Sequence, residues 1–465
     1  MIIRITVLDA LECAVTKRQA QFLVPCLSYK AEFWRKGQFS KKRTSYKKQL
    51  FSSKSKEYWY FYTGHLERVQ TYCKNKGWQI VLTYKEGIES LKIPFTEPNI
   101  PRITLREDQN KALKTALTIQ RGVIKEPTGT GKTILQMGIM SAIEGNILLL
   151  AHTSAIVNQT FEKLRNVGWD CAQIGGGMGY YDFDTMIADC KKIIIVATIQ
   201  SFAKLNVDNL ATFFDAVIVD EAHRVSSFDG QYAKVLGNLI APIRLGFTAT
   251  LPTKTSAKLA LEAFLGNLIS EQTINEAMEK EILAVPKIKI IKSRYRNSIR
   301  DVKKYADVYQ AGIVDNLSRN KQIVKIVKSH KEKGQTTLIF VNKIKHGNNL
   351  KEVFLKENIR VPFVNGKMEN EKREIIKKSL IRKKRKIVIA TIAWREGVDI
   401  PTLDVLFNAG GGKDELGVLQ TIGRALRRTE EKDSAIIYDM FDPSSPFLVN
   451  HFGHRISIYM EQGWL

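Results

Sequence analysis

The sequence contains the glycine-rich segment Glu126-Pro127-Thr128-Gly129-Thr130-Gly131-Lys132-Thr133, which is the strongest indication of its fold. An apolar, β-branched run at residues 122–124 precedes it, and a helical apolar pattern over residues 134–140 follows it. This order predicts a strand, a glycine-rich loop and a helix, which is the setting of a phosphate-binding loop. The glycines let backbone N–H groups surround a polyphosphate, and the start of the helix adds the positive end of its dipole.

Each residue of this loop has an expected role in binding ATP. Lys132 reaches the β- and γ-phosphates, Thr133 ligates Mg²⁺, and the backbone around them is supplied by Pro127, Thr128, Gly129, Thr130 and Gly131. Glu126 stands where such loops usually begin with glycine, a substitution that related loops tolerate. The alternative, a glycine-rich turn before an ordinary helix, is disfavoured because residues 129–133 keep the full pattern.

Length and charge suggest the domain count and the kind of partner. The chain has 465 residues, too many for one core, and about three domains are expected. Its formal net charge of +25 favours a polyanion as partner, the alternative being a solvated basic surface. No signal peptide or membrane-spanning run is found. The cysteines lack metal-ligand spacing and predict reduced thiols in a bacterial or phage-infected cytoplasm: Cys13, Cys26, Cys73, Cys171 and Cys190.

The first hundred residues differ in composition from the rest. They hold 16 of the 42 aromatic residues, and residues 30–56 contain ten basic side chains and one acid. Lysines among aromatic rings suit a nucleic-acid surface, whereas a small α+β domain would place the rings in its core. We expect the aromatics to be core, including a strand over 58–62, and the basic run to be a mobile loop that becomes ordered on binding. Its expected phosphate contacts are Lys41, Lys42, Arg43, Lys47 and Lys48.

The motif over residues 105–109 predicts adenine contacts. Pro94, Pro98 and Pro101 mark a linker before it, and a helix is expected to follow, with Ala112, Leu113, Ala116 and Leu117 on its buried face. Gln109 can bind an adenine edge with both ends of its amide, and Arg106 is a second expected ATP contact. The alternative for Gln109 is an ordinary surface glutamine.

Several apolar strands end in polar residues, where open α/β sheets place ligand contacts. The strand at 216–219 leads to Asp220 and Glu221. At this distance behind a phosphate loop, Asp220 is expected to hold Mg²⁺, and Glu221 to deprotonate the attacking water. The other strand ends and a glycine turn give candidate nucleic-acid contacts, each of which could also be a plain turn: His152, Thr153, Gly176, Thr198 and Gln200.

Together the motifs of residues 104–428 resemble those of superfamily 2 helicases. In order they are L-R-E-D-Q (105–109), E-P-T-G-T-G-K-T (126–133), A-H-T-S (151–154), A-T-I-Q-S (197–201), D-E-A-H (220–223) and F-T-A-T (247–250). The resemblance implies two RecA-like doubly wound parallel sheets, α/β in class, preceded here by a small basic α+β domain. The expected domains are residues 1–100, 101–272 and 273–465. The family also implies that His223, Thr248 and Thr250 couple hydrolysis to movement.

The second half matches the later family motifs. Nucleic acid is expected at Asn342 and Thr391, and ATP at Gly397 and Asp399. The sixth motif supplies Gln420, Arg424 and Arg427, and the two arginines, three residues apart on an expected helix, would present guanidinium groups to the γ-phosphate. The alternative for them is helix-surface ion pairs. The basic segment 287–304 is expected to be a strand pair near DNA or a solvated edge strand.

Within the family the chain resembles compact UvsW-like DNA helicases, which join a small duplex-binding domain to two RecA-like domains. This resemblance implies an ATP- and Mg²⁺-dependent helicase that remodels forks and four-way junctions. Expected partners are branched, duplex and single-stranded DNA, with no membrane and a monomeric state. Two alternatives are an RNA helicase or restriction-system motor, and a DNA-binding switch that uses ATP without unwinding.

Overall fold

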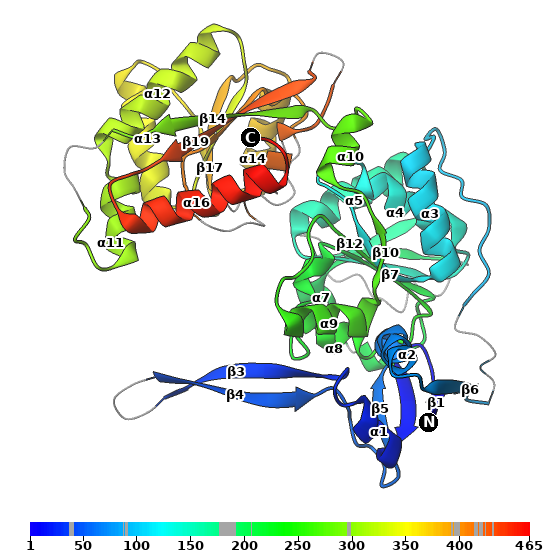
Figure 1. The fold of residues 1–465 in the computed structure, drawn as a ribbon. Coiled ribbons are helices and arrows are strands. Elements are labelled where there is room, and N and C mark those ends of the chain that lie inside the picture. The colour runs from blue at the N-terminus through cyan, green and yellow to red at the C-terminus, as the bar shows by residue number, and fades with distance from the viewer. Residues whose placement is uncertain are drawn as a thin grey trace. The chain divides into compact units, whose positions relative to one another are not determined.

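The computed structural model describes residues 1–36, 41–86, 88, 92–175, 192–205, 207–294, 299–391, 394, 400–412, 417, 422–423, 425–429 and 432–465. Two compact units make up the chain (Figure 1). The first contains Met1–Glu126 and Lys132–Glu271, and the second contains Pro127–Gly131 and Gln272–Leu465. Every helix within the described ranges is too short or too polar to cross a lipid bilayer.

Seven parallel strands form the main sheet of the first unit, in the order β13-β7-β12-β11-β8-β10-β9. Continuous apolar runs suit such strands because both faces of a parallel sheet are covered. In β8, Leu148 and Leu150 pack into one hydrophobic core, and Ile147 and Leu149 pack into another. The strands are β7 (Arg121–Lys125), β8 (Ile147–Ala151), β9 (Cys171–Ile174), β10 (Ile194–Thr198), β11 (Ala216–Asp220), β12 (Ile243–Thr248) and β13 (Leu268–Glu271).

Helices before and between these strands complete the α/β pattern. The expected buried face of the first is confirmed, since Ala112, Leu113, Ala116 and Leu117 are all buried. The helices are α3 (Glu107–Ile119), α4 (Lys132–Ala142), α5 (Ser154–Asn166), α7 (Ile199–Phe202), α8 (Gln231–Leu236) and α9 (Thr255–Leu265).

A smaller mixed region, which we call the N-terminal region (residues 1–86), belongs to the same compact unit. Its sheet has the order β5-β2-β1-β6, and the expected strand over 58–62 is confirmed as β5. Phe51, Trp59 and Phe61 pack into its core, as expected for the aromatics. Its elements are β1 (Ile2–Val7), β2 (Glu12–Thr16), α1 (Lys17–Leu23), β5 (Tyr58–Tyr62), η1 (Thr63–His65), α2 (Leu66–Asn75) and β6 (Gln79–Tyr84).

The basic run of this region is a β-strand, and the expected mobile loop was wrong. Strands β3 (Ser28–Lys36) and β4 (Lys41–Gln49) pair antiparallel as a separate two-stranded ribbon. Figure 1 shows this basic ribbon extending away from the N-terminal sheet. The pairing of the two strands extends from Ser28 opposite Gln49 to Lys36 opposite Lys41. Cross-strand pairing with a segment upstream outweighs the polar composition that favoured a loop.

The second unit is built on six parallel strands in the order β14-β19-β18-β15-β17-β16. The strands are β14 (Val285–Lys292), β15 (Thr337–Val341), β16 (Phe363–Val364), β17 (Ile387–Thr391), β18 (Val405–Asn408) and β19 (Ser434–Phe441). Its helices include α10 (Ile274–Glu279), α11 (Tyr305–Tyr309), α12 (Leu317–Glu332), α13 (Ile344–Lys356), α14 (Asn370–Ile381) and α16 (Pro446–Glu461).

The described part of segment 287–304 does not form the strand pair offered as one expectation. Among its described residues only β14 is a strand, and it pairs with β19 at the edge of the parallel sheet. Lys287 and Lys289 are exposed on it, which is the alternative of an edge strand protected by lysines. The expected class is confirmed: two parallel sheets, each with helices, follow a smaller mixed α+β region.

Candidate functional site

The glycine-rich loop lies between β7 and α4, as the sequence predicts. Gly129 and Gly131 have φ angles of 96° and 95°, which residues with a Cβ rarely adopt. The hydroxyl of buried Thr130 donates to the carbonyl of Pro127 at 2.9 Å, and Lys132 Nζ donates to the carbonyl of Glu126 at 3.1 Å. The loop is therefore a tight backbone turn with an ammonium group at the start of a helix, as a polyphosphate requires.

Asp220 and Glu221 stand at the carboxyl end of β11, within reach of the charge of Lys132. The Asp220 carboxylate accepts the backbone N–H of Glu221 at 3.0 Å. Burial, together with the negative charge of Glu221, raises the pKa of Asp220 to about 6, and the charge of Lys132 opposes this shift. These residues fit a divalent cation, because its charge would offset both the burial and the repulsion and because Mg²⁺ prefers oxygen ligands.

Glu221 has a left-handed backbone, with φ 51° and ψ 49°. A residue with a side chain adopts this conformation at a cost of about 1–3 kcal/mol, and such outliers cluster at functional sites. The turn brings Glu221 Oε2 within 3.3 Å of His223 Nδ1. Backbone strain at this position is thus combined with a carboxylate held beside an imidazole.

The three residues expected to couple hydrolysis to movement lie together. Thr248 Oγ1 is 3.1 Å from His223 Nδ1 and donates to the carbonyl of Thr250 at 2.7 Å. The carbonyl of Thr248 accepts the N–H of Glu126 at 2.9 Å. Thr248 therefore joins the start of the phosphate loop, the segment after β11 and the segment after β12.

Gln109 is buried at the start of α3. Its Oε1 accepts the backbone N–H of Arg106 at 3.1 Å, and the Arg106 guanidinium pairs with Asp108 at 2.9 Å. One end of the Gln109 amide thus takes part in capping the helix. The adenine contact expected of both ends stays a prediction.

The expected nucleic-acid contacts of the first sheet occupy neighbouring strand ends. Gln200 Nε2 lies 3.3 Å from His152 Nδ1. The hydroxyls of Thr153 and Thr198 cap α5 and α7, where they accept backbone N–H groups of Ile156 and Ser201. These two threonines fix helix starts at the edge of the sheet where β8 and β10 end.

In the second sheet, Asn342 and Thr391 follow or end neighbouring strands β15 and β17. Asn342 Nδ2 donates to the carbonyls of Gly410 and Gly411 at 3.2 and 3.4 Å. Tyr309 OH donates to the same Gly410 carbonyl at 2.8 Å. Asn342 therefore holds the turn that follows β18.

Several expected residues lie outside the described ranges, namely Gly176, Gly397, Asp399, Gln420 and Arg424. Arg427 is described, and its expected place on a helix was wrong. It forms an isolated antiparallel bridge with Leu283. The backbone leaves the helical conformation at Leu426, whose carbonyl accepts the N–H of Ala284 at 2.6 Å. Pairing with the segment before β14 thus replaces the helical turn.

The basic ribbon carries the expected N-terminal phosphate contacts. Lys47 is exposed and Lys48 is partly exposed on β4, while the side chains of Lys41, Lys42 and Arg43 lie outside the described set. In the backbone register Lys30 faces Lys47, Arg35 faces Lys42 and Lys36 faces Lys41. Like charges directly opposite each other destabilise a strand pair. A bound polyanion would therefore reduce the repulsion between the facing positive charges of the ribbon.

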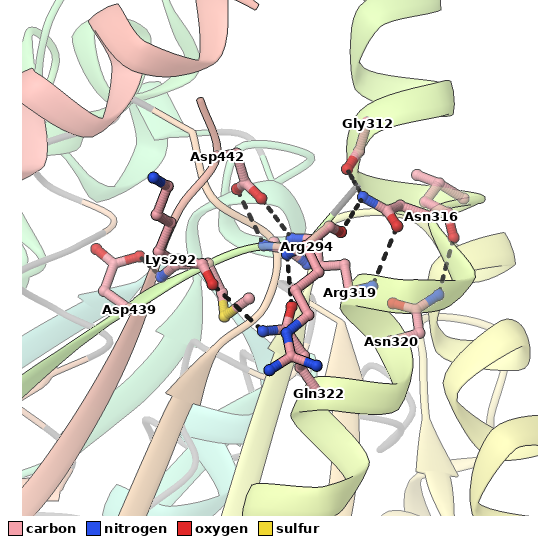
Figure 2. A network of polar contacts seen from close by, with 12 residues as sticks. Lys292, Arg294, Gly312, Asn316, Arg319, Asn320, Gln322, Asp439 and Asp442 are labelled. Carbon is pink, nitrogen blue, oxygen red and sulfur yellow. Dashed lines mark hydrogen bonds and ion pairs between the residues drawn. The ribbon is translucent and has the colours of Figure 1, made fainter. Parts of the chain in front are cut away.

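Sequence reasoning missed the buried ion pairs of the second unit. Figure 2 shows Arg319 of α12 against Asp442, with Nε donating to Oδ1 at 2.9 Å. Arg455 of α16 donates to Asp439 of β19 at 2.7 Å and to the carbonyl of Gly412 at 2.6 Å. An aspartate inside the apolar run of β19 was the available signal, since a buried charge requires a partner.

Two family models match this chain, each over most strands of one parallel sheet. The model described as "Type III restriction enzyme, res subunit" matches residues 102–253, and "Helicase conserved C-terminal domain" matches residues 318–429. The DNA 3'-5' translocase XPB2 of Sulfurisphaera tokodaii is 27% identical over 390 residues, covering 75% of this chain and 84% of that protein. The ATP-dependent DNA helicase uvsW of Enterobacteria phage T4 is 24% identical over 351 residues, covering 72% and 68%.

Solved structures share the fold. The DNA-bound Type ISP restriction-modification enzyme LlaBIII aligns with a TM-score of 0.58 and 17% identity, over 82% of this chain and 32% of that one. Dbp5 of S. cerevisiae, bound to RNA, aligns with a TM-score of 0.56 and 18% identity, over 77% and 88%. Two RecA-like sheets with a phosphate loop and paired acids on the first define an ATP-dependent motor on nucleic acid. The chain is a superfamily 2 helicase.

Proposed function

We propose that this helicase uses ATP and Mg²⁺ to move along DNA and to remodel branched DNA such as forks and four-way junctions. The observation that carries this proposal is the basic ribbon, which lies outside both parallel sheets yet belongs to the same compact unit as Lys132 and the paired acids. Remodelling a branch requires a grip on duplex DNA in addition to a motor on one strand. The ribbon supplies a candidate grip.

The shape and charge of the ribbon suit duplex DNA. A two-stranded ribbon fits the major groove of B-DNA. Its facing like charges, such as Lys30 opposite Lys47, favour a polyanion that neutralises them. Phosphate contacts of this kind position a protein without reading sequence, so duplexes of unrelated sequence should bind equally. DNA as the substrate is further supported by relatives named as a DNA translocase and a DNA helicase.

In this proposal each residue of the nucleotide site has its own chemical role. Lys132 would bind the phosphates, Thr133 and Asp220 would hold Mg²⁺, and Glu221 would take the proton of the attacking water. When bound, Mg²⁺ supplies charge that neutralises the phosphates during transfer. Arg424 and Arg427 would stabilise the transferring γ-phosphoryl group, because planar guanidinium groups match its oxygens.

The strand ends would carry one DNA strand. In this proposal that strand contacts His152, Thr153, Thr198 and Gln200 on the first sheet. On the second sheet it contacts Asn342 and Thr391. Helix starts such as that of α5 present backbone N–H groups to phosphates.

The deciding experiment measures ATP hydrolysis with single-stranded, duplex, forked and four-way DNA and with RNA of matched sequence. Strand displacement is measured on the same substrates. We expect forked and four-way DNA to give the greatest stimulation of ATP hydrolysis and the greatest ATP-dependent strand displacement. Equal or greater stimulation by RNA would support an RNA helicase instead. ATP-dependent changes in DNA affinity without displacement would support a binding switch.

A further inference from the structure

The N-terminal region is seated directly on α9 of the first parallel sheet. A Cβ atom at Gly64 would lie 2.0 Å from the carbonyl oxygen of Glu262 and 2.4 Å from that of Ala263. Buried His65 donates through Nε2 to the carbonyl of Leu259 at 2.9 Å, and Leu259 itself belongs to the N-terminal core. This contact between η1 and α9 is possible only because position 64 has no side chain.

Polar side chains fix the orientation of the same junction. Arg68 donates two hydrogen bonds to Glu262, at 2.6 and 2.7 Å. Asn267 donates to Glu67 at 2.7 Å. Paired parallel bonds between a guanidinium and a carboxylate restrict rotation as well as distance. The N-terminal region and the first sheet therefore behave as one body.

Phe228 lies where the ribbon meets this body. Its ring stacks on Tyr29 of β3 at 6.3 Å between centroids and on Tyr62 of β5 at 6.2 Å, with interplanar angles of 16° and 23°. It also contacts Phe264 of α9 at 5.9 Å. Phe228 packs against both the N-terminal core and the core of the first sheet. Aromatic pairs in such geometry add to the stabilisation given by buried area.

The chain connects Phe228 to the nucleotide site over a short distance. It follows His223 by five residues, in the segment between β11 and α8. Tyr29 and Lys48 face each other in the ribbon register, and Lys48 Nζ lies 3.6 Å from Asp229 Oδ2. Tyr29 and Lys48, which face each other across the ribbon, thus contact the adjacent residues Phe228 and Asp229. Both of these residues lie in the segment that follows Asp220 and Glu221. The ion pair is exposed and weak, so the rings are the main contact.

We propose that Phe228 is a positioning residue that fixes the basic ribbon relative to the nucleotide site, so that movement produced by hydrolysis is delivered to duplex DNA held by the ribbon. This inference rests on the proposed function, since it requires a duplex on the ribbon. Coupling of this kind is carried by packed side chains between two sites. Removal of the ring therefore uncouples hydrolysis from strand displacement without removing either ATP or DNA binding.

The test compares base pairs displaced per ATP hydrolysed for the full chain and for Phe228→Leu, on a four-way junction and a fork. Leucine keeps an apolar side chain but removes both stacks. The number of base pairs displaced per ATP is expected to fall about tenfold, a loss of coupling in the range seen for residues between sites. Hydrolysis on short single strands and affinity for the junction stay within about twofold, as for a site that contacts neither ligand. Phe228→Tyr, which keeps the ring, restores the ratio.

Phe213→Leu is the matched control, because Phe213 is a partly buried aromatic of the same core that pairs with Phe214 at 4.9 Å. Phe213→Leu should displace as many base pairs per ATP hydrolysed as the parent does. The inference is overturned if Phe228→Leu keeps the parent's ratio, or if both leucine variants lose hydrolysis and displacement in equal proportion. If Phe228→Leu fails to fold, Tyr29→Leu carries the same expectation and the same contrary result. Failure of the proposed function is distinct, since the parent would then remodel no branched DNA.

Discussion

The hydroxyl of Thr248 lies 3.1 Å from Nδ1 of His223, although the two residues come from different strand ends. The same hydroxyl donates to the carbonyl of Thr250, so that His223 Nδ1 must carry the proton in this hydrogen bond. The carbonyl of Thr248 also holds the N–H of Glu126 at the base of the phosphate loop. Hydrogen bonds through Thr248 therefore link the start of the phosphate loop, His223 and the segment after β12.

Thr248→Val should separate hydrolysis from movement. Valine has a similar size but lacks the hydroxyl, so His223 and Thr250 lose a buried partner at a cost of about 1–3 kcal/mol. We expect hydrolysis to fall only a few-fold, while strand displacement falls by about tenfold or more, as expected when coupling free energy is lost. Rates of both reactions on one fork provide the measurement. Thr160→Val, at a buried threonine of α5, serves as the control, and equal losses in both reactions would contradict a coupling role.

Lys132→Ala and Glu221→Gln should each abolish turnover while DNA binding survives. Electrostatic stabilisation and general-base catalysis each contribute about a hundredfold or more. Steady-state hydrolysis and fork affinity are measured in parallel. Lys125→Ala is the matched control, because Lys125 ends β7 and its ammonium group pairs with Glu271 of β13. Near-normal hydrolysis by Glu221→Gln would remove Glu221 as the base.

Neutralising the basic ribbon should weaken the grip on duplex DNA. The variant changes five residues together, Lys41, Lys42, Arg43, Lys47 and Lys48. Duplex and junction binding should fall, and the salt dependence should become shallower by about 0.9 in log–log slope for each phosphate that the variant no longer neutralises. Hydrolysis stimulated by short single strands should change little, because the nucleotide site is intact.

A charge-matched control supports that comparison. Five lysines of the second unit are neutralised instead, namely Lys321, Lys325, Lys331, Lys333 and Lys351. All five are exposed. If this control weakens duplex binding as much as the ribbon variant does, net charge rather than the ribbon is responsible. If the ribbon variant loses fork unwinding and single-strand hydrolysis in equal proportion, the N-terminal region is only a brace for the first sheet.

The packing contact between η1 and α9 should become less stable at low pH. Burial lowers the pKa of His65 from 6.5 to about 4, against the hydrogen bond to Leu259 and the charge of Glu262, which raise it. Between pH 6.5 and about 4, His65 therefore binds a proton in the unfolded chain but not in the folded chain. Stability is highest above pH 6.5 and falls by about 1.4 kcal/mol per pH unit as the pH drops towards 4.

The pH dependence is measured as the opening free energy of η1 and α9 from hydrogen exchange between pH 4 and 7. His65→Gln can still donate to the Leu259 carbonyl but does not titrate in this range. In this variant the opening free energy should not show the pH dependence that the parent shows. His346, whose pKa is lowered to about 3 by burial, lies in the second unit and is unchanged in both proteins. Identical slopes for parent and variant would exclude His65 as the cause.

The sequence was sufficient to predict the two parallel sheets and the strand, loop and helix around residues 126–133, for a physical reason. Several apolar strands end in polar residues, as β11 does in Asp220 and β12 does in Thr248. A buried parallel strand needs a continuous apolar run, and such runs are local. The apolar runs along the chain therefore predicted the α/β class with two parallel sheets.

Features that depend on distant partners were not predicted. The ribbon looked like a loop because its lysines and serines show their pairing only when Ser28–Lys36 lies opposite. Arg244 is fully buried in β12, where its guanidinium donates to the carbonyls of Leu236, Leu239 and Phe264 at 2.6, 2.6 and 2.7 Å. Arg427 left the expected helix to pair with Leu283. In each case the deciding contact lies elsewhere in the chain.

ATP-dependent conversion of a four-way junction into forked duplexes shows directly whether this helicase remodels branched DNA. A four-way junction with labelled arms of unrelated sequence is incubated with the full chain, ATP and Mg²⁺, with Glu221→Gln as the inactive control. We expect conversion of the junction into two forked duplexes that requires ATP and is absent in the control. Hydrolysis of ATP on the junction without any conversion, or conversion at the same rate by the Glu221→Gln variant, would contradict the claim.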